Sequence, residues 1–408
     1  MIHPIEERYR TEIADIFEEQ NRMNLMLKVE VALVKAHSDE NLISKDEYIK
    51  IKEAVPKIKL DQVKNIEKQT QHDIMALVQA LTDTSGCDKI HIGATSSDIV
   101  DTTLALQLKQ SNDIIIRDLT TFKNILLDRA EENKNLVCIG RTHGQHAVPM
   151  TYGMKFILWG YEVNECLKEL HNANFYGKMS GAVGTFASFA TLGENGQAIQ
   201  STVMSELKLK HPLVTNQVIP REVIAGYLFK LITIACIIDK IAKEIRNLQR
   251  TEIFEVAEPY QKDTQTGSST MPHKRNPHKA ENLSSLAKRL RTNILPALEN
   301  ISLEHERDLS NSATERIIIP ETVILTHYMI KQASFILKEL EFFDNNIVKN
   351  LLLSPSIFME KKMMELIKEG HGRQKAYQMA KKLFIKEDPS SYLGSSIDII
   401  NKCLRELR

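Results

Sequence analysis

Hydrophobic residues recur at spacings of three and four along several long segments of the chain. In residues 222–252 these positions are Ile224, Leu228, Leu231, Ala235, Ile238, Ile241, Ile245 and Leu248. The same spacing runs through residues 118–133, 279–298 and 315–340. Because such spacing gathers apolar side chains on one face of a helix, it predicts long amphipathic α-helices. They exceed the globular average of roughly three turns, which favours a bundle of long helices.

No βαβ alternation and no strand pattern is found, so we expect an all-α chain whose chemistry lies on loops and helix ends. The 16 glycines and 12 prolines of the 408 residues cluster between the periodic segments. These breaks predict an N-terminal helical domain at 1–93, a central long-helix bundle at 94–344 and a small C-terminal helical domain at 345–408.

The charge balance gives little reason to expect a polyanionic partner. Lys plus Arg and Asp plus Glu both total 53, so the chain carries no net field for nucleic acid or a membrane surface. The apolar stretch 224–238 contains Lys230 and is shorter than a membrane span. Five scattered cysteines without a CxxC motif suit a reducing compartment. With no apolar signal region at its start, the chain is expected to be cytoplasmic.

The segment 266–277, TGSSTMPHKRNP, concentrates hydroxyls, cations and an amide between glycine and proline. It lacks the spacing of a phosphate-binding P-loop. Its composition is also that of an ordinary solvated loop, although long loops between helices are often functional. Both interpretations stay open on composition alone.

A second polar block, GRTHGQHAVP at 140–149, places His143 and His146 three residues apart beside Arg141. A zinc site needs further ligands, and no HExxH motif is present, so we expect no metal. Histidine as a proton carrier near neutral pH is the functional interpretation, and a structural histidine is the alternative for either one.

Three further polar clusters have a functional and a structural interpretation each. His72 beside Asp73 is either an oriented imidazole or part of a polar helix surface. The hydroxyls and carboxylate of 95–98 suit a helix N-cap, which is also a place where anions bind. In 306–316, Arg307 and Arg316 bracket three hydroxyl side chains, which suits either a phosphate site or a surface charge run.

Taken together, these segments resemble the fumarase/aspartase superfamily, whose signature has the form GSSxMPxKxNP. Residues 267–277 match it at every fixed position. The blocks GRTHGQHAVP, HIGATSSDIVDT at 91–102 and KMSGAVGTFA at 178–187 resemble the adenylosuccinate lyase branch. The resemblance implies a three-domain all-α fold, a homotetramer whose active sites are shared between subunits, and neither metal nor organic cofactor. It also implies β-elimination of fumarate from adenylosuccinate, giving AMP, and from SAICAR, giving AICAR, in purine nucleotide biosynthesis.

The resemblance also implies roles for individual residues. The general base falls on Ser268, the general acid on His143, and a second active-site histidine on His72. Residues that match substrate-binding positions of the family are Arg8, Tyr9, Asp73, His91, Thr95, Ser96, Gln217, Ser269, Lys274, Asn276, Glu281, Arg307, Ser312 and Arg316.

The reaction explains why such groups are needed. Removing the proton from the succinyl Cβ creates an aci-carboxylate with two negative charges, and one aimed hydrogen-bond donor is worth roughly 3–4 kcal/mol there. Lys274, Asn276 and the backbone N–H groups of 267–269 are the natural donors. Serine needs a depressed pKa to act as a base, and histidine has a suitable pKa to protonate the leaving nitrogen.

The chain departs from the family in three places: its last domain is short, Gln71 stands where arginine or asparagine is common, and 312–314 reads Ser-Ala-Thr. Two other functions remain as alternatives. One is a carboxymuconate-cycloisomerase-like enzyme of the same superfamily. The other is a non-catalytic helical assembly protein, against which the intact Ser268, His143, Lys274 and Asn276 argue.

Overall fold

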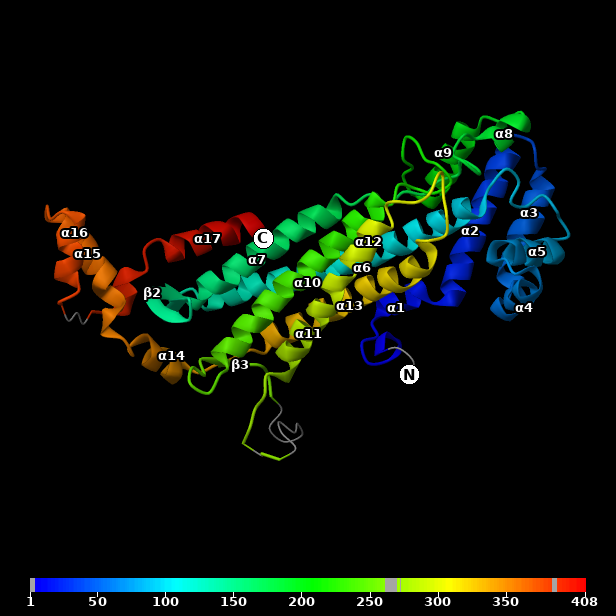
Figure 1. Cartoon of the computed structure of the whole chain (residues 1–408). Coiled ribbons are helices and arrows are strands. Elements are labelled where there is room, and N and C mark those ends of the chain that lie inside the picture. Colours follow the sequence, from blue (N-terminus) through cyan, green and yellow to red (C-terminus); the bar gives the residue numbers. More distant parts are fainter. Residues whose placement is uncertain (1–3, 261–269, 272, 384–386) are drawn as a thin grey trace. The chain divides into compact units, whose positions relative to one another are not determined.

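The computed structural model describes residues 4–260, 270–271, 273–383 and 387–408 (Figure 1). Most of the described residues are helical, which confirms the predicted helical class. The α-helices are α1 Glu12–Phe17, α2 Glu19–Asp39, α3 Lys45–Ala54, α4 Leu60–Thr70, α5 Asp73–Ser85, α6 Ser96–Glu132, α7 Tyr152–His171, α8 Ala187–Thr191, α9 Gly196–Leu207, α10 Glu222–Leu248, α11 His278–Thr292, α12 Ile294–Glu299, α13 Ser312–Lys338, α14 Asp344–Leu351, α15 Met359–Lys368, α16 Arg373–Ala380 and α17 Ser396–Leu407. The short 3-10 helices are η1 Pro4–Glu6, η2 Val55–Lys57, η3 Pro355–Phe358 and η4 Pro389–Tyr392.

The strands form two small antiparallel sheets, which the absence of a strand pattern did not predict. They are β1 Val137–Thr142 paired with β2 Gln145–Thr151, and β3 Val256–Ala257 paired with β4 Glu341–Phe342. Because both sheets are small, they leave the predicted all-α class unchanged. The sequence VCIGRT of β1 does not alternate apolar and polar residues. The two-residue period that indicates a strand is therefore absent.

The long helices follow the predicted periodic segments. The segment 222–252 corresponds to α10, which begins at Glu222 and ends at Leu248. The segment 118–133 is the second half of the 37-residue helix α6. The segment 279–298 forms α11 and α12 with a break at Asn293, and 315–340 lies mainly within α13.

Local sequence sets several helix ends. Ser44 caps α3, and Glu47 bonds back to the Ser44 backbone, which completes a capping box. The Asn195 side chain accepts hydrogen bonds from the first backbone N–H groups of α9. Gly86 ends α5 with a φ of 70°, a conformation that glycine adopts without steric cost.

The chain divides into two compact units. Unit 1 comprises Met1–Ile116, Glu169–Ile232 and Leu290–Tyr328, and unit 2 comprises Arg117–Lys168, Thr233–Arg289 and Met329–Arg408. The boundaries fall within α6, α7, α10, α11 and α13, so these helices contribute to both units. The sequential three-domain division at 93 and 344 does not coincide with these units and stays a prediction.

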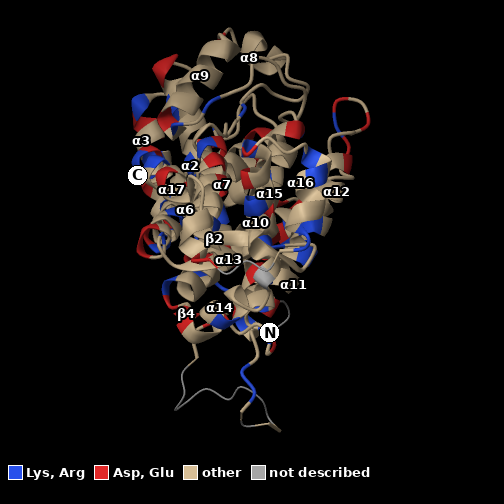
Figure 2. Ribbon diagram, turned by 90° about the vertical axis from the view of Figure 1, so that its left-hand side faces the viewer, with Lys and Arg blue, Asp and Glu red and all other residues tan. Residues whose placement is uncertain are grey.

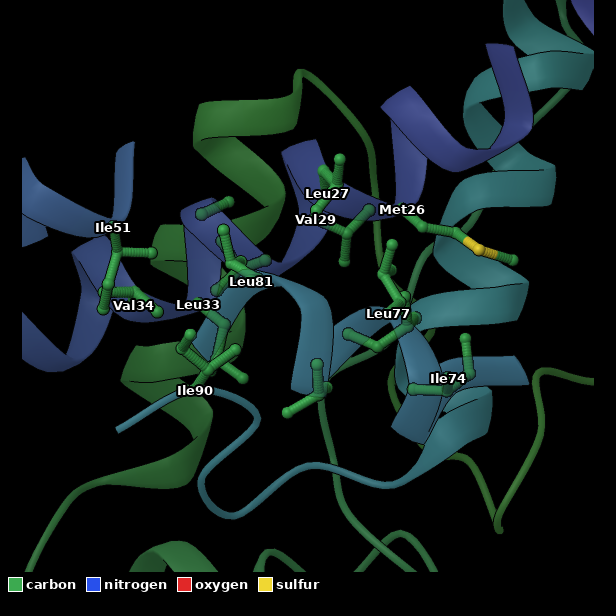
Figure 3. Packing of buried hydrophobic residues seen from close by; sticks show 14 of the residues in the cluster. Met26, Leu27, Val29, Leu33, Val34, Ile51, Ile74, Leu77, Leu81 and Ile90 are labelled. Carbon is green, nitrogen blue, oxygen red and sulfur yellow. The ribbon is translucent and has the colours of Figure 1, made fainter. Parts of the chain in front are cut away.

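Unit 1 has its core where α2, α3, α5 and α9 meet. Figure 3 shows Leu33 of α2 close to Leu81 of α5 and Ile90, with Ile51 of α3 beside Val34. These side chains are at most 5% exposed. Burying each one contributes about 1.5–3 kcal/mol, which fixes the helices whose ends carry the site residues of this unit.

In unit 2 the hairpin of β1 and β2 packs on the C-terminal segment. Ile139 of β1 is buried against Leu351, Ile357 and Phe358. The C-terminal residues thereby hold the block that contains His143.

Within the residues that the structure describes, we find no helix that is both long enough and apolar enough to cross a membrane. Figure 2 shows basic and acidic residues interspersed on the helices, in keeping with the balanced charge.

Candidate active site

His143 lies at the tip of the β1–β2 hairpin. Thr142 pairs with Gln145, so the turn consists of His143 and Gly144 alone. Their φ angles are 54° and 74°, and two positive φ values are what a type I′ turn requires. The tight turn leaves the His143 side chain exposed. His143 thus lies in a hairpin turn, whereas the sequence predicted a loop between helices.

His146 of the same block has a different setting. It pairs across the hairpin with Arg141 and is partly buried. Burial lowers the pKa of His146, the charge of Arg141 lowers it further, and Glu255 acts in the opposite direction. His146 therefore holds a proton less well than a free histidine, which leaves His143 as the candidate acid of the block.

His72 is the N-cap of α5. Its Nδ1 accepts a hydrogen bond from the backbone N–H of Met75 at 3.3 Å, and its Nε2 lies 3.4 Å from Ser96 Oγ. A neutral imidazole that accepts at Nδ1 carries its proton on Nε2. The imidazole is thus oriented as a donor toward the hydroxyl cluster at the start of α6. Asp73 beside it lies 3.6 Å from the Arg22 guanidinium.

Thr95 and Ser96 begin α6 as the predicted cap. The Thr95 backbone N–H donates to Asp98 Oδ2 at 2.8 Å, which is one of the two hydrogen bonds of a capping box. Asp98 also pairs with Lys178 of the KMSGAVGTFA block, and both side chains are fully buried. Asp98 therefore serves structure, while the Thr95 and Ser96 hydroxyls stay at the surface of the helix end.

His91 is held by a buried carboxylate. Its Nδ1 lies 2.8 Å from Glu30 Oε1, and Glu30 has no exposed surface. Burial acts to lower the pKa of His91, but the hydrogen bond and charge of Glu30, with the charge of Asp98, outweigh it, and the pKa is raised. His91 thus stays protonated to higher pH than a free histidine, which suits a positive group beside an anionic ligand.

A cavity of about 200 Å³ in unit 1 brings Arg307, Ser312 and Arg316 together. Ser312 is the first residue of α13, so its hydroxyl lies at a positive helix end. Arg307 donates to Gln217 Oε1 at 2.9 Å. Its buried Nε has no hydrogen-bond partner among the described residues. An unpartnered guanidinium N–H in a cationic cavity favours an anionic ligand.

Sequence reasoning missed Arg22 in this cavity. Burial lowers the pKa of Arg22, the Asp73 carboxylate opposes this, and the positive charge of Arg316 adds to it. Two neighbouring guanidinium groups gain from an anion between them. Arg22 lies in the ordinary polar run EEQNR of α2, so no local motif marked it, and only the fold places it here.

Arg221 also lines the cavity but is already engaged. It lies 2.9 Å from Asp101 and 3.4 Å from Glu315, and both acidic residues line the same cavity. Arg221 is therefore paired with these carboxylates, which leaves Arg22, Arg307 and Arg316 as the candidate ligand contacts.

The signature residues Lys274, Asn276 and Glu281 line a cavity of about 1000 Å³ in unit 2. Arg275 between them is committed elsewhere, because it pairs with Glu341 at 2.7 Å and stacks on the ring of Tyr260. The proposed base Ser268 and its neighbour Ser269 lie outside the described residues.

Arg8 and Tyr9 follow the short helix η1. The Tyr9 ring contacts that of Tyr328 edge to face, with 5.0 Å between the ring centres. Arg8 is exposed, and its positive charge acts on the hydroxyl of Tyr328. An exposed cation beside two phenols is compatible with ligand contact.

The structure thus assembles the predicted site residues in two groups. Unit 1 joins His72 with Asp73 and Ser96, joins Gln217 with Arg307, and gathers the phosphate candidates in one cavity. Unit 2 gathers the signature residues and, on its hairpin, carries His143.

The sequence comparisons decide the family. A family model described as "Lyase" matches residues 7–291. Over 394 residues the chain is 46% identical to an adenylosuccinate lyase of Pyrococcus abyssi, covering 94% of this chain and 87% of the relative. The chain belongs to the adenylosuccinate lyase family. It is 38% identical to an adenylosuccinate lyase of Bacillus subtilis over 378 residues, or 91% of this chain and 86% of that one. As a member of this family it is a lyase.

Solved structures agree on the fold. A fumarate lyase from Mesorhizobium sp. BNC1 superposes with a TM-score of 0.86 at 24% identity, covering 97% of both chains. A 3-carboxy-cis,cis-muconate lactonizing enzyme from Pseudomonas putida gives the same score and identity over 99% of both chains. At this identity they support the shared helical fold alone.

Proposed function

We propose that the chain cleaves adenylosuccinate to AMP and fumarate, and SAICAR to AICAR and fumarate. The observation that carries this is the unit 1 cavity, where Arg22, Arg307 and Arg316 meet Ser312 and a buried guanidinium N–H lacks a partner. Both substrates are phosphate esters, and a cluster of arginines with a hydroxyl at a helix N-terminus is a suitable phosphate site.

In the proposed reaction Ser268 takes the proton from the succinyl Cβ. The electron pair left behind forms the new C=C bond as the C–N bond breaks, and His143 protonates the leaving nitrogen. Lys274 and Asn276 would stabilise the aci-carboxylate, for which their shared cavity supplies space and positive charge. His72 would donate at Nε2 to the substrate, since its Nδ1 is occupied by Met75. The elimination as written needs no metal or organic cofactor.

The relatives favour this substrate over the carboxymuconate alternative. The identity of 38–46% is to adenylosuccinate lyases, whereas the muconate lactonizing enzyme is 24% identical. The non-catalytic alternative is disfavoured because His72, Lys274 and Asn276 are retained with polar surroundings suited to chemistry.

The direct test is fumarate release from adenylosuccinate, followed by absorbance and by chromatography of AMP. The proposal expects turnover with adenylosuccinate and SAICAR and none with 3-carboxy-cis,cis-muconate. Turnover of the muconate alone would replace the proposal with the cycloisomerase function. A folded protein inactive on all three would support the non-catalytic alternative.

We further propose a cytoplasmic homotetramer with shared sites, which binds neither nucleic acid nor a membrane. Large apolar side chains are exposed on the long helices: Leu158 of α7 at 48%, Phe229 of α10 at 60%, and Ile317 and Phe335 of α13 at 60% and 44%. Such faces are favourable when copies of the chain cover them. Light scattering should give about four times 46.5 kDa, and a stable, active monomer would contradict shared sites.

A further inference from the structure

Unit 2 contains a buried carboxylate, Glu255, that the proposed reaction does not use. Its side chain has no exposed surface. One oxygen accepts hydrogen bonds from Arg141 and from Asn350, and the other accepts from the Tyr152 hydroxyl at 2.6 Å. A fully buried charge is tolerated only with such partners, and both oxygens of Glu255 are satisfied in this cluster of four side chains.

The partners of Glu255 come from both sides of the hairpin that carries His143. Arg141 lies on β1 two residues before His143, and Tyr152 directly follows the last residue of β2. Asn350 belongs to α14, and its amide also donates to the Ile253 carbonyl at 2.7 Å. Glu255 therefore fastens the two arms of the hairpin to the segment between α10 and β3.

The hydroxyl of Tyr152 acts as a permanent donor in this cluster. Burial raises the pKa of Tyr152, and the negative charge of Glu255 raises it further. The phenol thus stays protonated at physiological pH and keeps its hydrogen bond to the carboxylate.

The hairpin tip has few other side-chain restraints. Among the described residues, the side chains of Thr142, His143 and Gln145 make no hydrogen bond. The position of the His143 backbone is consequently set by the strand ladder and by the arms that Glu255 holds. A displacement of about 1 Å at a reacting group can lower the rate about 100-fold.

We propose that Glu255 is a positioning residue that fixes the hairpin so that His143 meets the leaving nitrogen. This role rests on the proposed function, because it assigns the proton transfer to His143. Arg141 and Tyr152 act with it as the two anchors of the hairpin arms.

The test is steady-state kinetics of the full-length Glu255→Gln variant with adenylosuccinate. The amide keeps a similar shape and still accepts a hydrogen bond from Tyr152, but it leaves Arg141 buried without a counter-charge. The expected result is a kcat lowered about 100-fold with KM little changed, since the phosphate cavity lies in unit 1. An unchanged kcat in the folded variant would overturn the role.

A double variant separates positioning from stability. Arg141→Met combined with Glu255→Gln removes both charges and should recover much of the thermal stability that the single change loses. If Glu255 positions the hairpin, kcat stays low in the double variant. If kcat returns together with Tm, Glu255 has only a structural role. Should the single variant not fold, Tyr152→Phe removes one anchor and should lower kcat by a smaller factor, and an unaltered kcat there would also contradict the proposal.

The Lys155–Glu244 ion pair is a matched control. It joins α7 to α10 in the same unit at 2.7 Å, and its side chains are 14% and 33% exposed. Glu244→Gln should leave kcat as it is, and an equal loss in this variant would show that any ion pair near α7 has the same effect.

Wild-type protein without fumarate release would refute the proposed function, and this role with it. If the wild type is active and the Glu255→Gln variant has the same kcat, only the positioning role is refuted.

Discussion

The imidazole of His72 lies 3.4 Å from the Ser96 hydroxyl and thereby links the N-terminus of α5 to that of α6. The same ring caps α5 through Nδ1. Nδ1 of His72 thus has a structural role, whereas Nε2 faces the Ser96 hydroxyl, and the two roles can be separated by substitution.

Asparagine is among the strongest N-cap residues, whereas alanine costs about 1 kcal/mol at such a position. His72→Asn should therefore keep the thermal stability of the wild type, while His72→Ala should lose about that amount. Both variants should lose activity by a similar factor, because neither has an imidazole. Calorimetry and fumarate release measure the two effects, and full activity in His72→Asn would reduce His72 to a cap.

The phosphate cavity predicts a change in substrate affinity. Arg316→Met removes one charged hydrogen-bond donor, worth about 1.5–3 kcal/mol, which corresponds to a KM raised roughly 10- to 150-fold. Succinyladenosine, which lacks the phosphate, is the control substrate, and its kcat/KM should not respond to the substitution. An equal loss with both substrates would place the phosphate elsewhere.

Part of the site could be predicted from sequence because its residues lie in contiguous polar blocks. Thr95 and Asp98 predict the N-terminus of a helix, and α6 begins there. Arg22 could not be found this way, because its partners Asp73 and Arg316 are distant in sequence and meet only after folding. The periodicity of α10 predicted the helix since one face is continuously apolar.

The hairpin of His143 was missed for a different reason. Its strands are short, and one face packs on the C-terminal residues Leu351, Ile357 and Phe358. A single apolar stretch of that length has no period that distinguishes it from a loop. The buried role of Glu255 is equally hidden, because nothing in the run EIFEVAEP separates it from surface glutamates.

The ion pair of His91 and Glu30 predicts a pH dependence of stability. Because the folded-state pKa of His91 is raised, its contribution to stability is complete below the unfolded value of about 6.5. It is lost as pH rises through the folded-state pKa. Urea unfolding across this range should show stability falling with rising pH, and Glu30→Gln should flatten that part of the profile. A free energy of unfolding of the wild type that rises with pH in this range would contradict the stabilising role of the ion pair.

The central claim is that His143 and Ser268 perform one elimination. The most direct measurement is single-turnover fumarate release from adenylosuccinate by the wild type, His143→Ala and Ser268→Ala, with ligand binding and oligomeric state measured in parallel. Each variant should keep the assembly and bind substrate, and each should react about 10²–10⁴-fold more slowly than the wild type. Fumarate release at the wild-type rate by either folded variant would contradict the account.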